Sequence, residues 1–138
     1  MPTNRRYVLD ANTVVSGALL PRSVPRQAVD KALDRGKILL SPQTVAELER
    51  VLQRPKLDRY VRKSARLAFL VALVHAAEMV EPSETIEACR DPKDDMYLEL
   101  AINAEAACIV SGDADLLDME NYRGIPIVTA REFLDGAY

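Results

Sequence analysis

Short apolar runs alternate with longer amphipathic segments along this chain. Five of the runs have the length and composition of buried strands: residues 7–10, 38–40, 79–80, 108–110 and 126–128. Runs of this kind, bounded by turn-forming residues, are typical of a sheet that is covered on both faces. The longer segments between them therefore predict helices.

The helical segments carry start and stop signals. Residues 25–35 place apolar side chains at helical spacing and end at Gly36, and Ser41 can cap a helix that begins with Pro42. Further helices are expected up to residue 20, over 65–77, after 94 or 95, over 114–117 and after 129. Because strands alternate with helices and no repeat or linker divides residues 1–138, we predict an α/β single-domain αβα sandwich. Its sheet should be mostly parallel, with about five strands.

Composition excludes several classes of protein. The chain has 18 Lys and Arg against 21 Asp and Glu, so it is not a uniformly basic nucleic-acid coat. Cys89 and Cys108 are too few for a disulfide scaffold, and the lone His75, which we expect to be partly buried, cannot build a multi-histidine site. The longest apolar stretch, residues 67–77, is too short to span a bilayer, and the first residues lack a secretory signal. We therefore expect a reduced, cytoplasmic protein without a membrane partner.

Charge is unevenly distributed between the two halves of the chain. Residues 1–66 carry a net +8 and residues 67–138 a net −11. The densest basic stretch is 50–66, in which Arg50 and Arg54 lie one helical turn apart. This stretch could bind phosphates or an acidic partner, and a solvated helical face would look the same.

Four acidic residues stand where a parallel sheet would gather them. Asp10 and Asp113 each follow a predicted strand, Asp95 opens a helix, and Glu47 borders the apolar stripe of another helix. Ligands bind beyond the carboxyl ends of such strands. Two carboxylates 4 Å apart repel by ~4 kcal/mol at an effective dielectric constant of 20, so a cluster favours a cation. Only oxygen ligands are offered, which favours Mg²⁺ or Mn²⁺ and phosphodiester hydrolysis by a metal-activated water.

The segments VLDANT, VAELERVL, DPKDDMYLELA and CIVSGDADLL, in this order, resemble the acidic motifs of the PIN-domain ribonucleases. The resemblance is strongest to the bacterial and archaeal branch that supplies toxins of type II toxin–antitoxin modules. It implies a PIN-like αβα fold, Mg²⁺ or Mn²⁺, and endonucleolytic cleavage of RNA. It also implies assembly into a homodimer or higher homo-oligomer and inhibition by a small antitoxin protein.

The resemblance also implies roles for individual residues. The catalytic acids would be Asp10, Glu47, Asp95 and Asp113. The metal would be bound by Asp10, Asp95, Asp113 and Asp115. The polar residues that support these acids would be Asn12, Ser16 and Ser111. Asp95 is preferred over Asp94 because Leu98 and Ala101 then fall where the apolar face of the motif's helix needs them, and Asp91 and Asp94 are expected to be loop or solvent residues. Ala11 departs from the Thr or Ser that is common in this branch.

Two alternatives remain open from the sequence. DANT is one residue away from the DxDxT motif of haloacid-dehalogenase phosphatases, although Asn12 replaces its second acid. A non-catalytic PIN-like domain that binds a partner through its basic face is the other alternative.

Overall fold

A computed structural model describes residues 5–138 of the chain. The strands are β1 (Arg5–Leu9), β2 (Gly36–Leu40), β3 (Glu78–Met79), β4 (Cys108–Val110), β5 (Asn121–Tyr122) and β6 (Ile125–Val128). The α-helices are α1 (Ala11–Leu19), α2 (Val24–Arg35), α3 (Pro42–Leu52), α4 (Lys63–Ala76), α5 (Asp95–Asn103), α6 (Ala114–Leu117) and α7 (Ala130–Asp135). Two short 3₁₀ helices, η1 (Pro55–Arg59) and η2 (Pro92–Asp94), precede α4 and α5.

The sheet has six strands in the order β3-β2-β1-β4-β6-β5. All neighbouring pairs are parallel except β5 and β6, which confirms the predicted αβα architecture with a mostly parallel sheet. The additional strand, β5, has only two residues and no hydrophobic pattern. It forms because Arg123 and Gly124 both adopt positive φ angles, as a tight two-residue hairpin turn requires.

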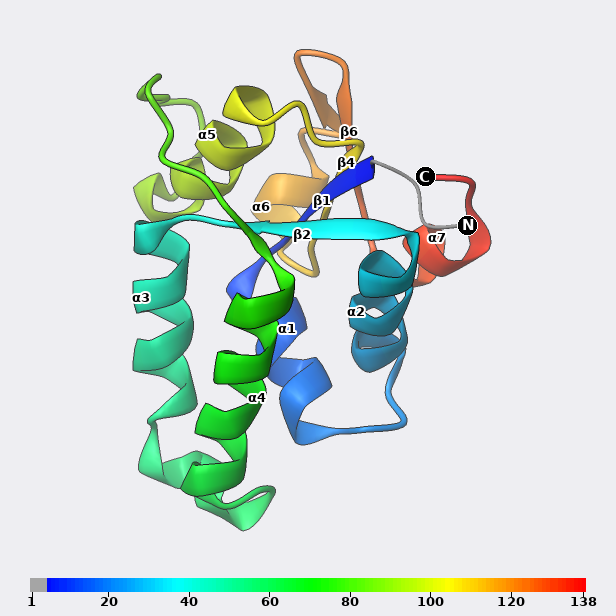
Figure 1. The fold of residues 1–138 in the computed structure, drawn as a ribbon. Helices are drawn as coiled ribbons and strands as arrows, with labels where there is room; N and C mark the ends of the chain where they lie inside the picture. Colours follow the sequence, from blue (N-terminus) through cyan, green and yellow to red (C-terminus); the bar gives the residue numbers. More distant parts are fainter. Residues whose placement is uncertain (1–4) are drawn as a thin grey trace.

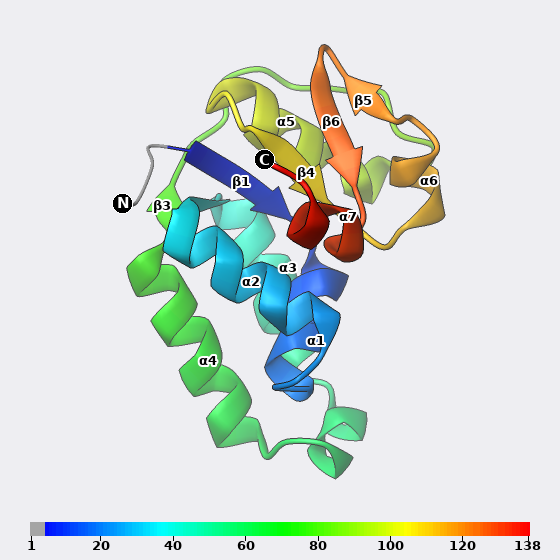
Figure 2. The same ribbon diagram turned by 90° about the vertical axis from the view of Figure 1, so that its right-hand side faces the viewer.

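Helices cover both faces of the sheet: Figure 1 shows α5 on one side and α2 and α4 on the other. Side chains of the central strands fill the core, including fully buried Tyr7, Ile38 and Ile109. Phe133 of α7 packs edge-to-face against Tyr7, with ring centroids 5.1 Å apart. Figure 2 shows the same layers from the side.

Local capping explains where several helices begin. Asp10, directly after β1, accepts the N–H of Thr13 and so starts α1. Ser41 starts α3 in a capping box with Thr44, as the Ser-Pro signal predicts. Since β1 and β2 end next to these caps, α1 and α3 leave the sheet at the same edge, and this edge carries the candidate site.

Helix α3, η1 and the start of α4 form a hairpin that projects away from the sheet (Figures 1 and 2). Arg66 of α4 lies inside it and is only 1% exposed. Arg66, the last residue of the basic stretch 50–66, is therefore not available to a solvated or phosphate-binding face. His75, expected to be partly buried, is exposed on α4. None of the helices within residues 5–138 is both long and apolar enough to cross a membrane.

Candidate active site

A cavity of about 250 Å³ opens at the carboxyl ends of β1 and β4. Its acidic lining residues are Asp10, Glu47, Asp91, Asp94 and Asp113, and its basic ones are Arg50, Arg54 and Lys93. Asp10 follows β1 directly, and Asp113 comes three residues after the end of β4. Both side chains line the cavity, as expected for residues that follow neighbouring parallel strands, whose carboxyl ends lie at one edge of the sheet.

Asp10 is held in position by hydrogen bonds. It is buried, one carboxylate oxygen accepts the Thr13 N–H at 2.9 Å, and the other accepts the Ser111 hydroxyl at 2.5 Å. The same Ser111 oxygen accepts the N–H of Asp113 at 2.9 Å. Ser111 therefore ties together the segments that carry Asp10 and Asp113, in the supporting position that was predicted for it.

The third acid on the cavity is Asp94, and the prediction that Asp95 occupies this place is wrong. The Asp95 carboxylate accepts the N–H groups of Ala88 and Cys89 at 3.1 and 2.8 Å, and Asp95 does not line the cavity. Burial alone would raise the pKa of Asp95, but these two N–H groups hold it below its ordinary value. Asp95 thus fixes the preceding loop, whereas Asp94, at the end of η2, lines the cavity.

Asp94 faces an unfavourable environment for a carboxylate. Burial, together with the neighbouring carboxyl of Asp113, raises the pKa of Asp94 to about 7. Its Oδ2 atom is buried and has no hydrogen-bond partner, and within the described part of the chain no other buried side-chain oxygen or nitrogen lacks one. A proton or a cation bound at this oxygen would satisfy the buried acceptor and reduce its repulsion with the second carboxyl group.

Glu47 lies on α3 at the cavity, and its carboxylate forms a two-point ion pair with Arg50 at 2.6 and 3.1 Å. This hydrogen-bonded pairing lowers the pKa of Glu47. The Arg50 side chain is 55% exposed, so its guanidinium is accessible from solvent. Arg54, one turn further along the chain, lines the same cavity. Arg50 and Arg54, the two arginines that were expected to bind either phosphates or an acidic partner, therefore border the acids.

Two other predicted residues lie elsewhere. Asp115 was expected to bind the metal, but it pairs with Arg90 at 3.1 Å on a separate surface hollow. Ser16 was expected to support Asp10; it lines a neighbouring cavity, and no hydrogen bond among residues 5–138 joins it to Asp10. Asn12 is exposed and lines both cavities. The direction in which the chain leaves β1 and β4 determines where these three side chains lie, and the sequence motifs do not specify that direction.

Besides Asp94, three polar residues that were not predicted as site residues line the cavity: Asp91, Lys93 and Tyr97. The Tyr97 hydroxyl accepts the N–H of Ala11 at 3.0 Å, and its burial raises the pKa of the phenol. This bond is made by the backbone of Ala11, so the absence of a hydroxyl side chain there does not affect it. Tyr97 lies three residues after Asp94, one helical turn, which is the signal that could have identified it.

The donor set suits a hard divalent cation. Among residues 5–138 no group of three or more His, Cys, Asp or Glu side chains is already arranged around an ion position. Mg²⁺, however, is commonly bound through one or two carboxylates and several waters. Asp94, with its unpartnered oxygen, and Asp113 offer such a pair, and Asp10 lies beside them on the cavity.

Comparison with known proteins identifies the family. A sequence profile of the PIN domain matches residues 6–115. The uncharacterized protein MJ1680 of Methanocaldococcus jannaschii is 26% identical over 141 residues, which covers 94% of this chain and 90% of that protein.

Solved structures share the fold. PAE2754 of Pyrobaculum aerophilum superposes with a TM-score of 0.64 at 18% identity, covering 97% of this chain and 90% of that one. VapBC2 of Rickettsia felis, bound to a promoter DNA fragment, superposes with a TM-score of 0.60 at 13% identity, covering 88% of this chain and 96% of that one. DNA-bound VapBC of Salmonella typhimurium superposes with a TM-score of 0.60 at 16% identity, covering 91% of this chain and 98% of that one. PIN domains are generally nucleases that use divalent metal ions. With most of its length matched by the profile, including the strands and acids around the cavity, this chain belongs to the PIN domain family.

Proposed function

We propose that the protein is a divalent-metal-dependent endoribonuclease. The observation that carries the proposal is the pair of Asp94 and Asp113, with a buried unpartnered oxygen, beside a fixed Asp10 in a cavity bordered by arginines. A polyanionic substrate would be repelled by the acids alone, and a cation at this point would remove the repulsion. Family membership favours this function over the phosphatase alternative.

Each lining residue has a role in this proposal. Asp94 and Asp113 would hold the ion, in place of the predicted Asp95 and Asp115. A bound Mg²⁺ or Mn²⁺ supplies charge neutralisation and a more acidic water. Asp10, fixed by Ser111 and the Thr13 N–H, keeps a carboxylate oriented beside that pair. Glu47 holds the Arg50 guanidinium at the cavity, where Arg50 and Arg54 would bind the substrate phosphates.

The test is cleavage of single-stranded and hairpin RNA by the purified protein with Mn²⁺ or Mg²⁺. We expect cleavage that EDTA abolishes and that Asp113→Asn reduces at least ~100-fold. Asp115→Asn is the matched control: it removes an acid two residues away that lies outside the cavity, and it should keep most of the activity. Undiminished cleavage in EDTA would contradict the proposal.

We further propose that the nuclease is the toxin of a toxin–antitoxin module, acting in the cytoplasm. Two structures with the same fold are VapBC complexes, which are antitoxin–toxin pairs. The predicted antitoxin partner and the predicted homodimer or higher homo-oligomer belong to this proposal. Induced expression in a bacterial host should arrest growth, and Asp113→Asn should relieve the arrest. Unimpaired growth with abundant active protein would contradict it.

A further inference from the structure

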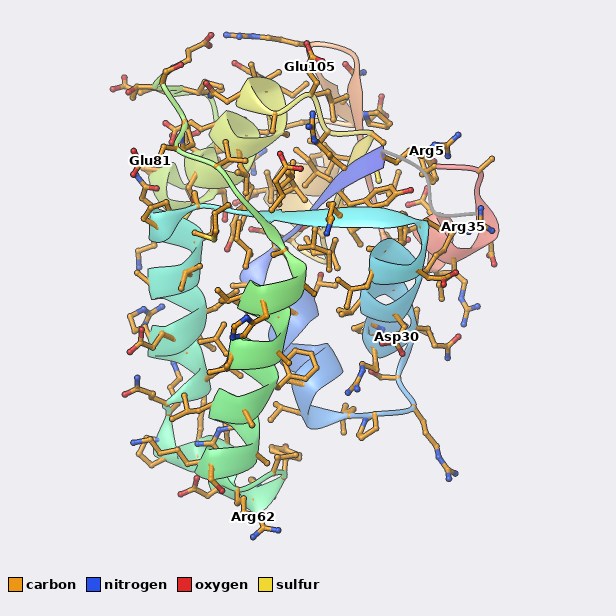
Figure 3. All side chains as sticks on the ribbon, viewed as in Figure 1. Arg5, Asp30, Arg35, Arg62, Glu81 and Glu105 are labelled. Carbon is orange, nitrogen blue, oxygen red and sulfur yellow. The ribbon has the colours of Figure 1, made fainter. Side chains whose placement is uncertain are left out.

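The hairpin between α3 and α4 ends in a dense group of positive charges, which we call the cationic tip and define as residues 55–63. Lys56, Arg59, Arg62 and Lys63 are all exposed there. Figure 3 shows Arg62 at the far end of the hairpin, pointing away from the body of the molecule. The acid within the tip, Asp58, is paired with Arg66 at 2.9 Å. The tip therefore presents its positive charge to solvent.

The tip is held in one conformation from inside. The buried Arg66 guanidinium donates hydrogen bonds to the carbonyl oxygens of Leu52 at 2.7 Å and Arg54 at 3.4 Å, and also to that of Val61. These carbonyls lie at the end of α3 and on both sides of η1, so one side chain connects the whole turn. The exposed cations are consequently mounted on a fixed backbone.

Folding stability does not account for these charges. Arg62 and Lys63 stand at the N-terminus of α4, which has no acidic residue in its first turn and no capping side chain. Positive charges at this end of a helix oppose the helix dipole. Neither side chain has an ion-pair partner within residues 5–138. The arrangement is unfavourable for the free protein and suits one that binds an anion.

We propose that the cationic tip binds the RNA backbone several nucleotides away from the cleaved bond. This inference rests on the proposed ribonuclease function. Arg50 and Arg54 line the cavity, and η1, where the tip begins, starts at the residue after Arg54, so the tip directly follows the arginines of the cavity along the chain. Tyr60, 56% exposed and with the Arg59 guanidinium 5.4 Å from its ring centre, offers a surface on which a base can stack. The exposed Tyr60 ring, together with the arginines that precede the tip at the cavity, favours RNA as the ligand over an acidic protein segment.

The test compares two double variants that each remove one Arg and one Lys. Arg62→Gln with Lys63→Gln changes the tip. Arg22→Gln with Lys37→Gln changes exposed cations that lie outside the tip and the cavity. Binding of a labelled RNA of about 20 nucleotides is measured in EDTA between about 50 and 200 mM salt. Cleavage of this RNA, and of one of about four nucleotides, is measured with Mn²⁺.

We expect the tip variant to bind the longer RNA roughly 10- to 25-fold more weakly near 0.1 M salt, with the salt-dependence slope reduced by about 1.4. Its kcat/KM should fall for the longer RNA and not for the short one, while the control changes neither. Tyr60→Leu should weaken binding by about fivefold or more. Equal binding by the tip and control variants, or equal loss on both RNA lengths, would overturn the inference. Absence of cleavage by the unmodified protein would instead contradict the proposed function, and binding in EDTA would still test the tip.

Discussion

At the scale of single residues, the chemistry of the cavity depends on how the charge of Asp94 is balanced. Its carboxyl group lies beside that of Asp113, and its buried Oδ2 atom has no hydrogen-bond partner. The neighbouring Asp95 instead accepts two backbone N–H groups. Adjacent and chemically identical side chains thus have opposite effects on the free energy of folding.

Asp94→Asn is expected to abolish divalent-dependent cleavage and, without metal, to raise Tm. The neutral amide removes the repulsion with Asp113, on the order of 1 kcal/mol or about 4 °C for a domain of this size. Asp94 makes no capping hydrogen bond that would be lost. Asp95→Asn is the matched control and should lower Tm while keeping most of the activity. Thermal melts in EDTA and RNA cleavage with Mn²⁺ check both; loss of activity with Asp95→Asn alone would contradict the assignment of Asp94.

The raised pKa of Asp94 makes stability depend on pH in a defined direction. The native carboxyl binds a proton up to about pH 7, whereas an unperturbed one releases it near 3.8. The native state therefore binds more protons between these values, and the free energy of unfolding falls as pH rises from about 4 to 7. For this partly exposed group we expect a fall of about 1 kcal/mol. The measurement is the difference between wild type and Asp94→Asn in urea unfolding in EDTA; identical pH profiles would contradict it.

At the scale of elements, the hairpin of α3, η1 and α4 depends on Arg66. Three carbonyl oxygens and Asp58 accept hydrogen bonds from this one guanidinium. A buried charge is tolerated here because the guanidinium donates four hydrogen bonds, one of them to a carboxylate. These hydrogen bonds, together with the buried Leu57 of η1, hold the cationic tip in one conformation.

Arg66→Met should lower the free energy of unfolding by about 3 kcal/mol, because it leaves buried carbonyls unsatisfied. Asp58→Asn is the control, since the Asp58 side chain is 62% exposed and its ion pair is screened by solvent. It should cost less than about 1 kcal/mol. Urea unfolding of both variants measures the difference. A cost for Arg66→Met no larger than that for Asp58→Asn would show that the hairpin does not depend on this residue.

At the scale of the whole molecule, net charge differs between the two halves of the chain, which carry +8 and −11. Figure 3 places Arg62 at one end and Glu105 at the other. This follows the basic first half and acidic second half of the chain. The cavity lies where acids of α3 and η2 meet the acids that follow β1 and β4, so binding there connects distant parts of the chain.

Divalent ions should therefore stabilise the entire fold. A ligand that binds only the native state adds about 2.7 kcal/mol at a concentration 100 times its Kd. We expect Mn²⁺ and Mg²⁺ to raise Tm in proportion to the logarithm of their concentration, and Asp94→Asn and Asp113→Asn to abolish this rise. Asp115→Asn should keep it. Thermal melts with and without metal test this, and an unchanged Tm at millimolar metal would contradict binding at the cavity.

The sequence by itself determined the alternation of strands and helices, because periodicity and capping are properties of neighbouring residues. It also placed Asp10 and Asp113 on one edge, because the ends of parallel strands meet there, and it placed Glu47 at the border of the buried face of a helix. Only the tertiary structure chose Asp94 over Asp95. That choice depends on the turn of η2 and on N–H groups from a loop that precedes it. The burial of Arg66 was likewise decided by carbonyls that local sequence patterns do not reveal.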